Sequence, residues 1–423
     1  MAESIDTSGI DAEVRSWIAA NWDPDLALAA WRSLLADSGW ACPTWPTQWG
    51  GRGLPRAATA IAAKAFADTD APGPPAVGVG ILMAAPMLLE HGSDELRARH
   101  LRPIVTGQQR WCQLFSEPGS GSDLAGLTTR ATRDGEEWVI EGQKVWVTGA
   151  DKADYAILLA RTNWDVPKHR GISCFVLPMR QPGIEVRRLR QMNEHSSFSE
   201  VFLSGVRVPH TNLVSELGNG WAVAQSVLAS ERAHAGAINL NPPQVRGAGR
   251  AEAEAAAEMT EFLETYKWYP QRAGRPDLVI EHARAVGADT DPVMRQRIAA
   301  QHTLVRVAGW NRERAQAAAA RGVRPGPEAS IAKLLGTLIA RVSAAIHGDL
   351  AGATGMLTGP SAPFDGMIAE VLVSVPAGSI AGGTDEIQRN IVGERVLGLP
   401  REPADDLATA FKDVRVNAAQ TLR

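Results

Sequence analysis

The stretch LFSEPGSGSDLAG, Leu114 to Gly126, has the composition of a ligand-binding turn. Gly119 and Gly121 allow backbone conformations with positive φ and let a ligand approach closely. Three serines at positions 116, 120 and 122 add hydroxyls, and the turn offers backbone N–H groups to an anion. The pattern predicts a site for a phosphate- or flavin-type ligand. Taken alone it also fits an ordinary polar turn, and it is neither a P-loop nor a Rossmann fingerprint.

A second candidate is the strand end KVWVTGA, Lys144 to Ala150. Trp146, Val147 and Thr148 would place a flat aromatic surface and a hydroxyl at one edge of a sheet. In isolation, a strand with an aromatic core residue explains this pattern equally well.

A carboxylate that could act as a base lies in the segment Trp221 to Ile238, which is expected to be helical. Residues at spacings of three and four form one stripe, namely Trp221, Ala224, Leu228, Glu231, Ala235 and Ile238. Burial of Glu231 among apolar residues should raise its pKa toward working pH, which suits a general base. The alternative is a structural ion pair with Arg232 or with a neighbouring helix. His234 is expected to be a core or surface residue.

The elements that position these residues fall into three zones. Residues 1–112 are predicted to form an N-terminal helical domain, with patterned segments such as SDELRARHLRPIV. Residues 113–218 form a central β-domain, with short apolar runs such as YAILLARTN and GISCFVLP between turns. Residues 219–423 return to helical periodicity and are predicted to form a C-terminal helical bundle. Within them, Asn239 to Pro292 is interpreted as an extra helix or excursion on that bundle.

The composition is ordinary for a globular chain of 423 residues, with 45% hydrophobic and 21% charged residues and a formal net charge of −4. No basic tract indicates nucleic-acid binding. Three widely spaced cysteines predict buried thiols rather than disulfides or a metal site. The apolar run Ala76 to Leu89 contains Gly and Pro and is shorter than the ~20 residues of a membrane span, so a buried helix is expected. No signal peptide is visible, and a cytoplasmic location is expected.

Three motifs occur in a fixed order: SEPGSGSD, then GQKVWVT, then GGTDEIQRN near the C-terminus. In this order they closely resemble the acyl-CoA dehydrogenase family, in particular its actinobacterial FadE-like, steroid-degradation branch. The segments TWPTQWGG, FSEVFLSGVRVP and GPEASIAKLL extend the resemblance over nearly the whole chain. It implies an α+β, mainly α fold with an N-terminal helical domain, a central β-barrel-like domain and a C-terminal four-helix bundle. It also implies non-covalently bound FAD.

The resemblance assigns roles residue by residue. Contacts to the flavin or its ribityl and pantetheine surroundings are implied for Phe115, Ser116, Gly121, Ser122, Trp146, Val147 and Thr148, with the Thr148 hydroxyl reaching flavin N5. Gly383, Thr384 and Glu386 would contact the phosphate and adenosine portion of FAD. Ser122 and Arg232 would contact the substrate.

Two positions depart from the family pattern. Many members carry the catalytic glutamate where this chain has Gly382, so only the backbone N–H remains there to polarise the thioester carbonyl. Some members place the base in a Glu-Arg pair of the helix that here reads SERAHAG, and by that resemblance Glu231 is the predicted base. Asp349 replaces a Gln that often contacts FAD from a neighbouring subunit.

The expected function is therefore α,β-dehydrogenation of an acyl-CoA to a 2-enoyl-CoA, with electrons passed to an electron-transferring flavoprotein. The small Ala381 and Gly382 predict a bulky, branched or cyclic acyl group. The family implies a homo- or heterotetramer, with neither nucleic acid nor membrane as a partner. Two alternatives stay open: a non-catalytic or FAD-sharing subunit of a heteromeric acyl-CoA dehydrogenase, and a flavin oxidase or monooxygenase on the same fold.

Overall fold

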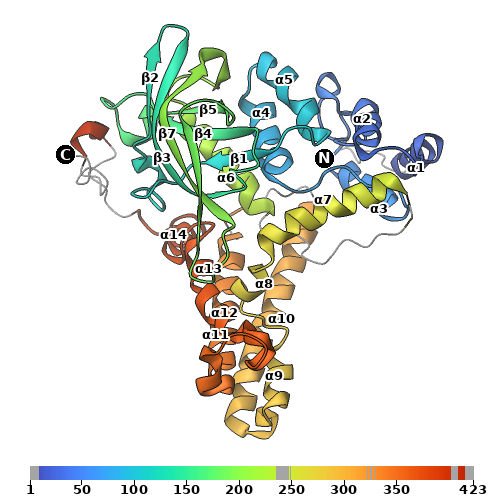
Figure 1. Cartoon of the computed structure of the whole chain (residues 1–423), viewed down its shortest axis with the longest axis vertical. Helices are drawn as coiled ribbons and strands as arrows, with labels where there is room; N and C mark the ends of the chain where they lie inside the picture. Colours follow the sequence, from blue (N-terminus) through green and yellow to red (C-terminus); the bar gives the residue numbers. More distant parts are fainter. Residues whose placement is uncertain are drawn as a thin grey trace. The chain divides into compact units, whose positions relative to one another are not determined.

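The computed structural model describes residues 9–234, 247, 249–321, 323, 326–327, 329–401 and 408–414, and Figure 1 shows the order of the elements. The chain divides into two compact units. Unit 1 comprises Met1–Leu189, Ser197–Thr265 and Ala404–Arg423, and unit 2 comprises Arg190–Ser196 and Tyr266–Pro403. Each unit is described by itself.

Unit 1 begins with helices packed around tryptophan. They are α1 (Ile10–Asn21), α2 (Leu28–Ser38), η1 (Thr47–Trp49), α3 (Ala57–Ala67), η2 (Gly80–Ala84), α4 (Ala85–His91) and α5 (Asp94–Val105). Trp31 is fully buried, packs against Trp17 and Trp22, and donates its indole N–H to the Pro72 carbonyl at 2.7 Å. An indole can fill a core in this way because its one polar atom is satisfied. The expected helix in the run from Ala76 is present as η2 and α4.

The central part of unit 1 is an eight-stranded sheet. Its strands are β1 (Trp111–Leu114), β2 (Arg130–Asp134), β3 (Glu137–Thr148), β4 (Tyr155–Arg161), β5 (Ile172–Pro178), β6 (Ile184–Leu189), β7 (Phe198–Pro209) and β8 (Leu213–Val214). The strand order is β6-β7-β3-β2-β4-β5-β8, and β1 pairs with β4 in parallel. Short 3-10 turns lie between strands at η3 (Leu124–Gly126), η4 (Lys168–Gly171) and η5 (His210–Asn212).

Strand β4 is buried on both faces and therefore divides two cores. Ile157 and Leu159 point to a core shared with α4, α5 and α6, whereas Ala156 and Leu158 point to a core shared with β3 and β7. Alternate side chains of a strand face opposite sides of the sheet, so one apolar strand can serve both cores. Figure 1 shows α4 and α5 beside this part of the sheet.

Two helices of unit 1 follow the sheet: α6 (Gly220–His234) and α7 (Arg250–Tyr266). Helix α6 begins directly on β5, where a Cβ on Gly220 would lie 2.5 Å from the Ser173 carbonyl carbon. The stripe predicted from the sequence is present as far as Glu231, while Ala235 and Ile238 lie outside the described residues.

Helix α7 packs on the N-terminal helices, whereas the sequence predicts an addition to the C-terminal bundle. Its Ala251 is fully buried in the tryptophan-rich core of these helices. Glu254 accepts the backbone N–H of Leu28 at 2.8 Å, and Glu258 pairs with Arg32 at 2.7 Å. These long-range partners, which the sequence does not reveal, determine where the helix lies.

Unit 2 is helical. Its elements are α8 (Tyr269–Arg272), α9 (Val279–Ala285), η6 (Ala288–Thr290), α10 (Pro292–Ala320), α11 (Ala329–Ala351), η7 (Gly352–Met356), η8 (Pro363–Gly366), α12 (Met367–Ser374), α13 (Pro376–Ile380), α14 (Asp385–Ile391) and η9 (Val392–Val396). Helices α10 and α11 run alongside each other (Figure 1). Two stretches, Ala329–Met356 and Pro363–Val396, are long and apolar enough to span a membrane, but core helices of a bundle meet the same criteria.

A buried histidine pair joins α9 to α11. The Nδ1 atoms of His282 and His347 are 2.9 Å apart, and His347 Nε2 lies 3.0 Å from the Arg275 carbonyl oxygen. That geometry suits two neutral rings, with His347 donating to the carbonyl and accepting from His282. Burial lowers the pKa of both rings, and each stays neutral more readily than in the unfolded chain.

We therefore expect the stability of unit 2 to fall with acidification. A lowered folded pKa gives stability that is complete above the ordinary histidine pKa of about 6.5 and is lost as the pH falls through the folded value. Thermal unfolding measured between pH 7.5 and 5 should show a smaller decrease in Tm for a His282→Phe/His347→Leu double variant than for the wild type. The exposed His302→Gln variant is the control. Equal decreases in all three proteins would contradict this expectation.

Candidate functional site

The glycine-rich turn leaves β1 at Phe115 and presents its tip to solvent. Phe115 is buried and Ser116 is half-buried, whereas Gly121 and Ser122 are exposed. No atom lies within 4 Å of the place a Cβ would take on Gly121, so a ligand could approach the backbone there. Glu117 and Ser120 close the turn through two backbone hydrogen bonds of 3.0 Å.

A buried ion pair anchors this turn to strand β3. Lys144 Nζ lies 2.9 Å from Glu117 Oε1 and 3.0 Å from the Phe115 carbonyl oxygen, and neither charged side chain is more than 5% exposed. Glu117 also accepts the backbone N–H groups of Thr128 at 2.7 Å and Thr129 at 2.9 Å. Burial alone would raise the pKa of Glu117, but the Lys144 charge and these hydrogen bonds lower it to about 2. The two sequence motifs are therefore physically joined.

Trp146 follows this anchor in an unusual conformation. Its φ is +62°, and the register between β3 and β7 shifts between Lys144 and Val147, which marks a bulge. The indole is 60% exposed and meets Phe198 edge-on at 5.9 Å, while Val147 is buried and Thr148 is half-buried. A bulky residue in the left-handed region is a strained outlier, and such outliers gather at functional sites. The interpretation of Trp146 as a core residue does not hold.

The turn and the strand end lie side by side. The Val145 N–H donates to the Ser116 carbonyl oxygen at 2.9 Å, directly next to the Lys144 anchor. The structure thus brings together Phe115, Ser116, Trp146, Val147 and Thr148 from the residues predicted to contact flavin. The combined surface is an exposed aromatic ring beside a polar, glycine-containing turn.

Glu231 lies on α6 in the same unit and is half-buried. Burial raises the pKa of its carboxyl group above the ordinary value, while a hydrogen bond with the Gln113 side chain and the charge of Arg232 oppose that shift. Ser230 fixes the helix by donating to the Leu82 carbonyl of η2 at 2.7 Å. Gln113 on β1 was not predicted as a site residue, and its position two residues before Phe115 is the only sequence signal that could have indicated it.

The third motif forms a turn between α13 and α14 in unit 2. Gly382 and Gly383 have φ values of +67° and +82°, a region that favours glycine. A Cβ on Gly382 would meet no atom within 4 Å, whereas one on Gly383 would lie 2.7 Å from Gln388 Nε2. The Gln388 amide also donates to the Gly382 carbonyl at 2.9 Å. Both glycines are exposed, but the space that a side chain would take is empty at Gly382 and is filled by Gln388 at Gly383.

Three residues follow this turn. Asp385 is buried and holds the turn in place, whereas Thr384 and Glu386, the predicted FAD contacts, are partly and fully exposed. Thr384 caps α14 by accepting the Ile387 N–H at 3.3 Å, and the exposed Glu386 pairs with Arg389 at 3.2 Å. Asp385 is buried and accepts hydrogen bonds from Lys333 at 2.7 Å and Thr337 at 3.1 Å. Burial raises the pKa of Asp385, but these bonds outweigh it and lower the pKa. The candidates Gly382, Gly383, Thr384 and Glu386 belong to unit 2, whereas the other candidates belong to unit 1.

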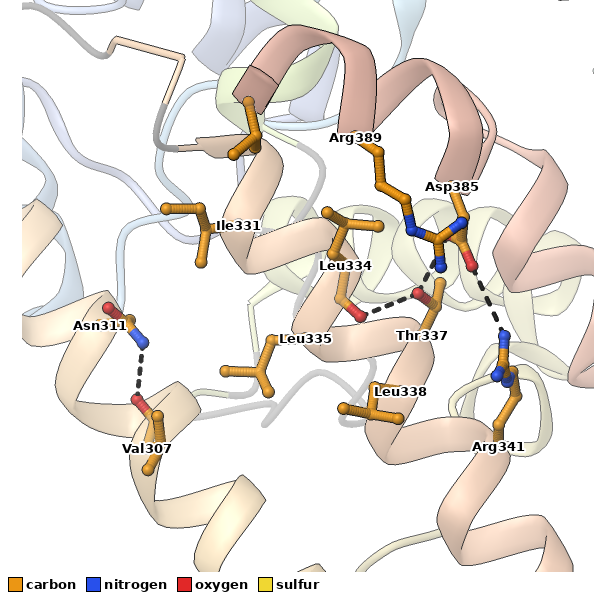
Figure 2. A pocket seen from close by; sticks show the side chains of 11 residues that line it. Val307, Asn311, Ile331, Leu334, Leu335, Thr337, Leu338, Arg341, Asp385 and Arg389 are labelled. Carbon is orange, nitrogen blue, oxygen red and sulfur yellow. Dashed lines mark hydrogen bonds and ion pairs between the residues drawn. The ribbon is translucent and has the colours of Figure 1, made fainter. Parts of the chain in front are cut away.

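A cavity of about 430 Å³ lies between α10, α11 and α14 within unit 2 (Figure 2). Apolar side chains of α10 and α11 line most of it, among them Val307, Leu334 and Leu338. Figure 2 shows Asp385 at one end with Arg341, whose guanidinium lies 3.9 Å from the carboxylate. Further along α11, Asp349 pairs with Arg297 of α10 at 2.5 Å.

Sequence comparisons identify the class of protein. Residues 10–108, 112–206 and 276–397 match the N-terminal, middle and C-terminal domains of acyl-CoA dehydrogenase, respectively. The chain is 32% identical over 420 residues to "Acyl-CoA dehydrogenase IpdE1" of Mycobacterium tuberculosis (strain ATCC 25618 / H37Rv), covering 94% of this chain and 99% of the relative. The chain belongs to the acyl-CoA dehydrogenase family and is an oxidoreductase of that class.

Solved structures agree with this assignment. The ChsE4-ChsE5 complex from Mycobacterium tuberculosis matches with a TM-score of 0.63 and 27% identity, covering 95% of this chain and 100% of that one. The "Tcur3481-Tcur3483 steroid ACAD" matches with a TM-score of 0.63 and 26% identity, covering 93% and 98%. The acyl-CoA dehydrogenase fold and the steroid-degradation branch predicted from the sequence are thereby confirmed.

We expect the Glu117–Lys144 pair to determine the stability of unit 1. Glu117→Gln or Lys144→Met alone leaves one buried charge without its partner, a change that costs roughly 3–5 kcal/mol in the free energy of unfolding. The double variant should cost less than the sum of the two single variants, because it leaves neither charge behind. Urea unfolding of the four proteins at pH 7 measures this coupling.

Acid should remove the same stability. The pKa of Glu117 is lowered by folding, so its ionised form stabilises the fold above the unfolded pKa, and this contribution is lost as the pH falls toward about 2. Lys168→Met, which removes the partly exposed pair with Asp123 at 3.0 Å, is the matched control and should cost less. Strict additivity of the Glu117 and Lys144 variants would contradict the expected coupling.

Proposed function

We propose that this chain is an FAD-dependent acyl-CoA dehydrogenase in which Glu231 removes the α-proton of a bulky acyl-CoA, and in which bound FAD would supply N5 as the acceptor of the β-hydride. The product is a 2-enoyl-CoA. The observation that carries the proposal is a half-buried carboxyl group on α6 with a raised pKa, in a family member that has Gly382 where many relatives have a glutamate. A carboxylate whose proton affinity is raised by burial suits proton abstraction near neutral pH.

The residues of unit 1 fit an isoalloxazine ring. Trp146 offers an exposed aromatic face, Thr148 a half-buried hydroxyl on the same strand, and the Ser116 region a polar edge. Members of this family depend on FAD, which when bound supplies the hydride acceptor. In unit 2, Gly383, Thr384 and Glu386 would contact the phosphate and adenosine portion. Gly383 is exposed, and its positive φ favours glycine at that turn.

The substrate would be held by Ser122 on the exposed tip of the turn and by Arg232 next to the base. Gly382 supports a wide acyl group because it lacks a side chain and no atom fills the space beside it. Its backbone N–H would polarise the thioester carbonyl, which lowers the cost of the negative charge that develops on oxygen. Relatives described as a steroid ACAD favour a cyclic acyl group.

The partners follow from the same family. Electrons would pass to an electron-transferring flavoprotein, and the enzyme would work in the cytoplasm as a homo- or heterotetramer, without membrane or nucleic acid. One observation favours the second candidate, a subunit that shares its FAD sites with a different chain. Asp349 stands where a Gln often reaches FAD across subunits, and it is engaged by Arg297 of its own unit. The ChsE4-ChsE5 structure is itself a complex of two chains.

The test is an anaerobic titration of the purified protein with linear, branched and steroid acyl-CoA thioesters. We expect a bulky thioester to bleach the visible flavin band, and Glu231→Gln to slow that bleaching by about 10²–10⁴-fold, the usual contribution of a general base. The exposed Glu216→Gln, just before α6, is the matched control and should leave the rate unchanged. Fast bleaching by Glu231→Gln would refute the base. Fastest turnover with a short linear thioester would refute the bulky substrate.

Glu231 should also cost stability in the absence of substrate. A carboxyl pKa raised by folding favours the protonated form, so its ionisation destabilises the fold as the pH rises above the unfolded value of about 4.3. Glu231→Gln should therefore raise Tm at pH 7.5, and this gain should vanish near pH 4. A Tm that Glu231→Gln lowers more at pH 7.5 than near pH 4 would show that the carboxylate is stabilised by pairing, and an equal change at both pH values would show that folding does not shift its pKa.

A further inference from the structure

The described C-terminal segment, residues 408–414, packs on the β4–β5 loop of unit 1. Phe411 is only 2% exposed, and its N–H donates to the Val166 carbonyl at 2.9 Å. Lys412 donates its backbone N–H to the Trp164 carbonyl at 3.0 Å, and the rings of Trp164 and Phe411 are 5.3 Å apart. The segment is thus fixed by backbone hydrogen bonds and by one buried aromatic side chain.

Under Phe411 lies Arg161, a fully buried arginine at the end of β4. Its guanidinium carbon is 3.4 Å from the centre of the Phe411 ring, a close cation–π contact. All three nitrogen atoms donate to carbonyl groups: Nε to Leu127 at 3.0 Å, Nη2 to Ala125 at 2.6 Å and Nη1 to Lys168 at 3.0 Å. The edge of the guanidinium is satisfied by backbone, and its face is covered by the aromatic ring.

These carbonyl groups belong to the glycine-rich turn and to the loop that supports it. Ala125 lies in η3 and Leu127 follows η3, a few residues after the exposed Gly121 and Ser122. Lys168, whose carbonyl accepts from Arg161, also pairs through its Nζ with Asp123 of the turn at 3.0 Å. Covering the guanidinium with Phe411 excludes water from these bonds, and buried hydrogen bonds of charged groups are strong for that reason.

We propose that Phe411 is a positioning residue: through Arg161 it holds residues 119–127 in the conformation that binds flavin and the thioester. The inference rests on the proposed function for its consequence in catalysis, because only that function makes the turn a ligand site. Removing the ring lets water reach the guanidinium, so the turn gains alternative conformations. The ligands must then order it, and binding weakens while the chemical groups stay in place.

The first test is amide hydrogen exchange of the purified holoprotein. In Phe411→Ala, peptides covering 119–127 should exchange about tenfold faster, equivalent to ~1.4 kcal/mol, whereas peptides of α11 should not change. Phe411→Leu, which keeps apolar burial but removes the ring face, should show a smaller increase in the same peptides. If Phe411→Ala does not fold, exchange at residues 119–127 in Phe411→Leu serves as the test in its place. Lys412→Ala, which removes only an exposed pair with Asp165 at 2.7 Å, is the control and should match the wild type.

The second readout separates positioning from a general loss of structure. Phe411→Ala should weaken binding of FAD and raise KM for the thioester by several-fold, with kcat at saturation changed less. Unchanged exchange at 119–127, or an equal increase in every region of unit 1, would overturn the inference. A wild-type protein that binds no FAD would refute the proposed function, yet the exchange result would still report on the turn.

Discussion

The ion pair between Glu117 and Lys144 is the constraint on which the candidate site of unit 1 depends. Both side chains are buried, so the free-energy cost of desolvating each charge is offset only if the other charge and further hydrogen bonds pair with it closely. The carboxylate meets this demand through Lys144 and the N–H groups of Thr128 and Thr129, and the ammonium through Glu117 and a carbonyl. Because the two partners come from different motifs, the pair fixes the distance between the glycine-rich turn and the strand that carries Trp146.

The same arrangement, an exposed candidate residue close to a buried and fully paired charge, recurs in unit 2 and at the C-terminal segment. Exposed candidates such as Gly382 and Ser122 each lie a few residues from a buried charged residue, Asp385 and Glu117 respectively. Arg161 supplies a third such anchor. A flexible glycine-containing turn can keep one conformation when neighbouring charged side chains are held by fixed partners. Such preorganisation reduces the entropic cost of ordering the site when a ligand binds. The strained Trp146 is tolerated in the same way, because β3 is held on both sides of it.

The sequence predicted the fold where the pattern was local. Strands such as β4 and β5 are continuous apolar runs, and the helical zones follow their periodicity. Strand β6, with its three charged residues, has no such signal and was not predicted.

The family motifs predicted Phe115, Ser116 and Trp146 as site residues, and the structure places them together. The anchors Glu117, Lys144, Asp385 and Arg161 were not predicted, since their roles arise from partners far apart in the chain. The φ of Trp146 and the packing of α7 are equally non-local.

The central claim is that a carboxylate on α6 replaces the glutamate missing at Gly382. Exchange of the substrate α-proton tests it most directly, because exchange requires the base but no net oxidation. The holoenzyme would be incubated anaerobically in D₂O with a bulky acyl-CoA that it binds but cannot dehydrogenate, and deuterium at the α-carbon measured by mass spectrometry. The account predicts incorporation by the wild type and by the exposed control Glu216→Gln, and none above background by Glu231→Gln with FAD still bound. Undiminished incorporation by Glu231→Gln would contradict it.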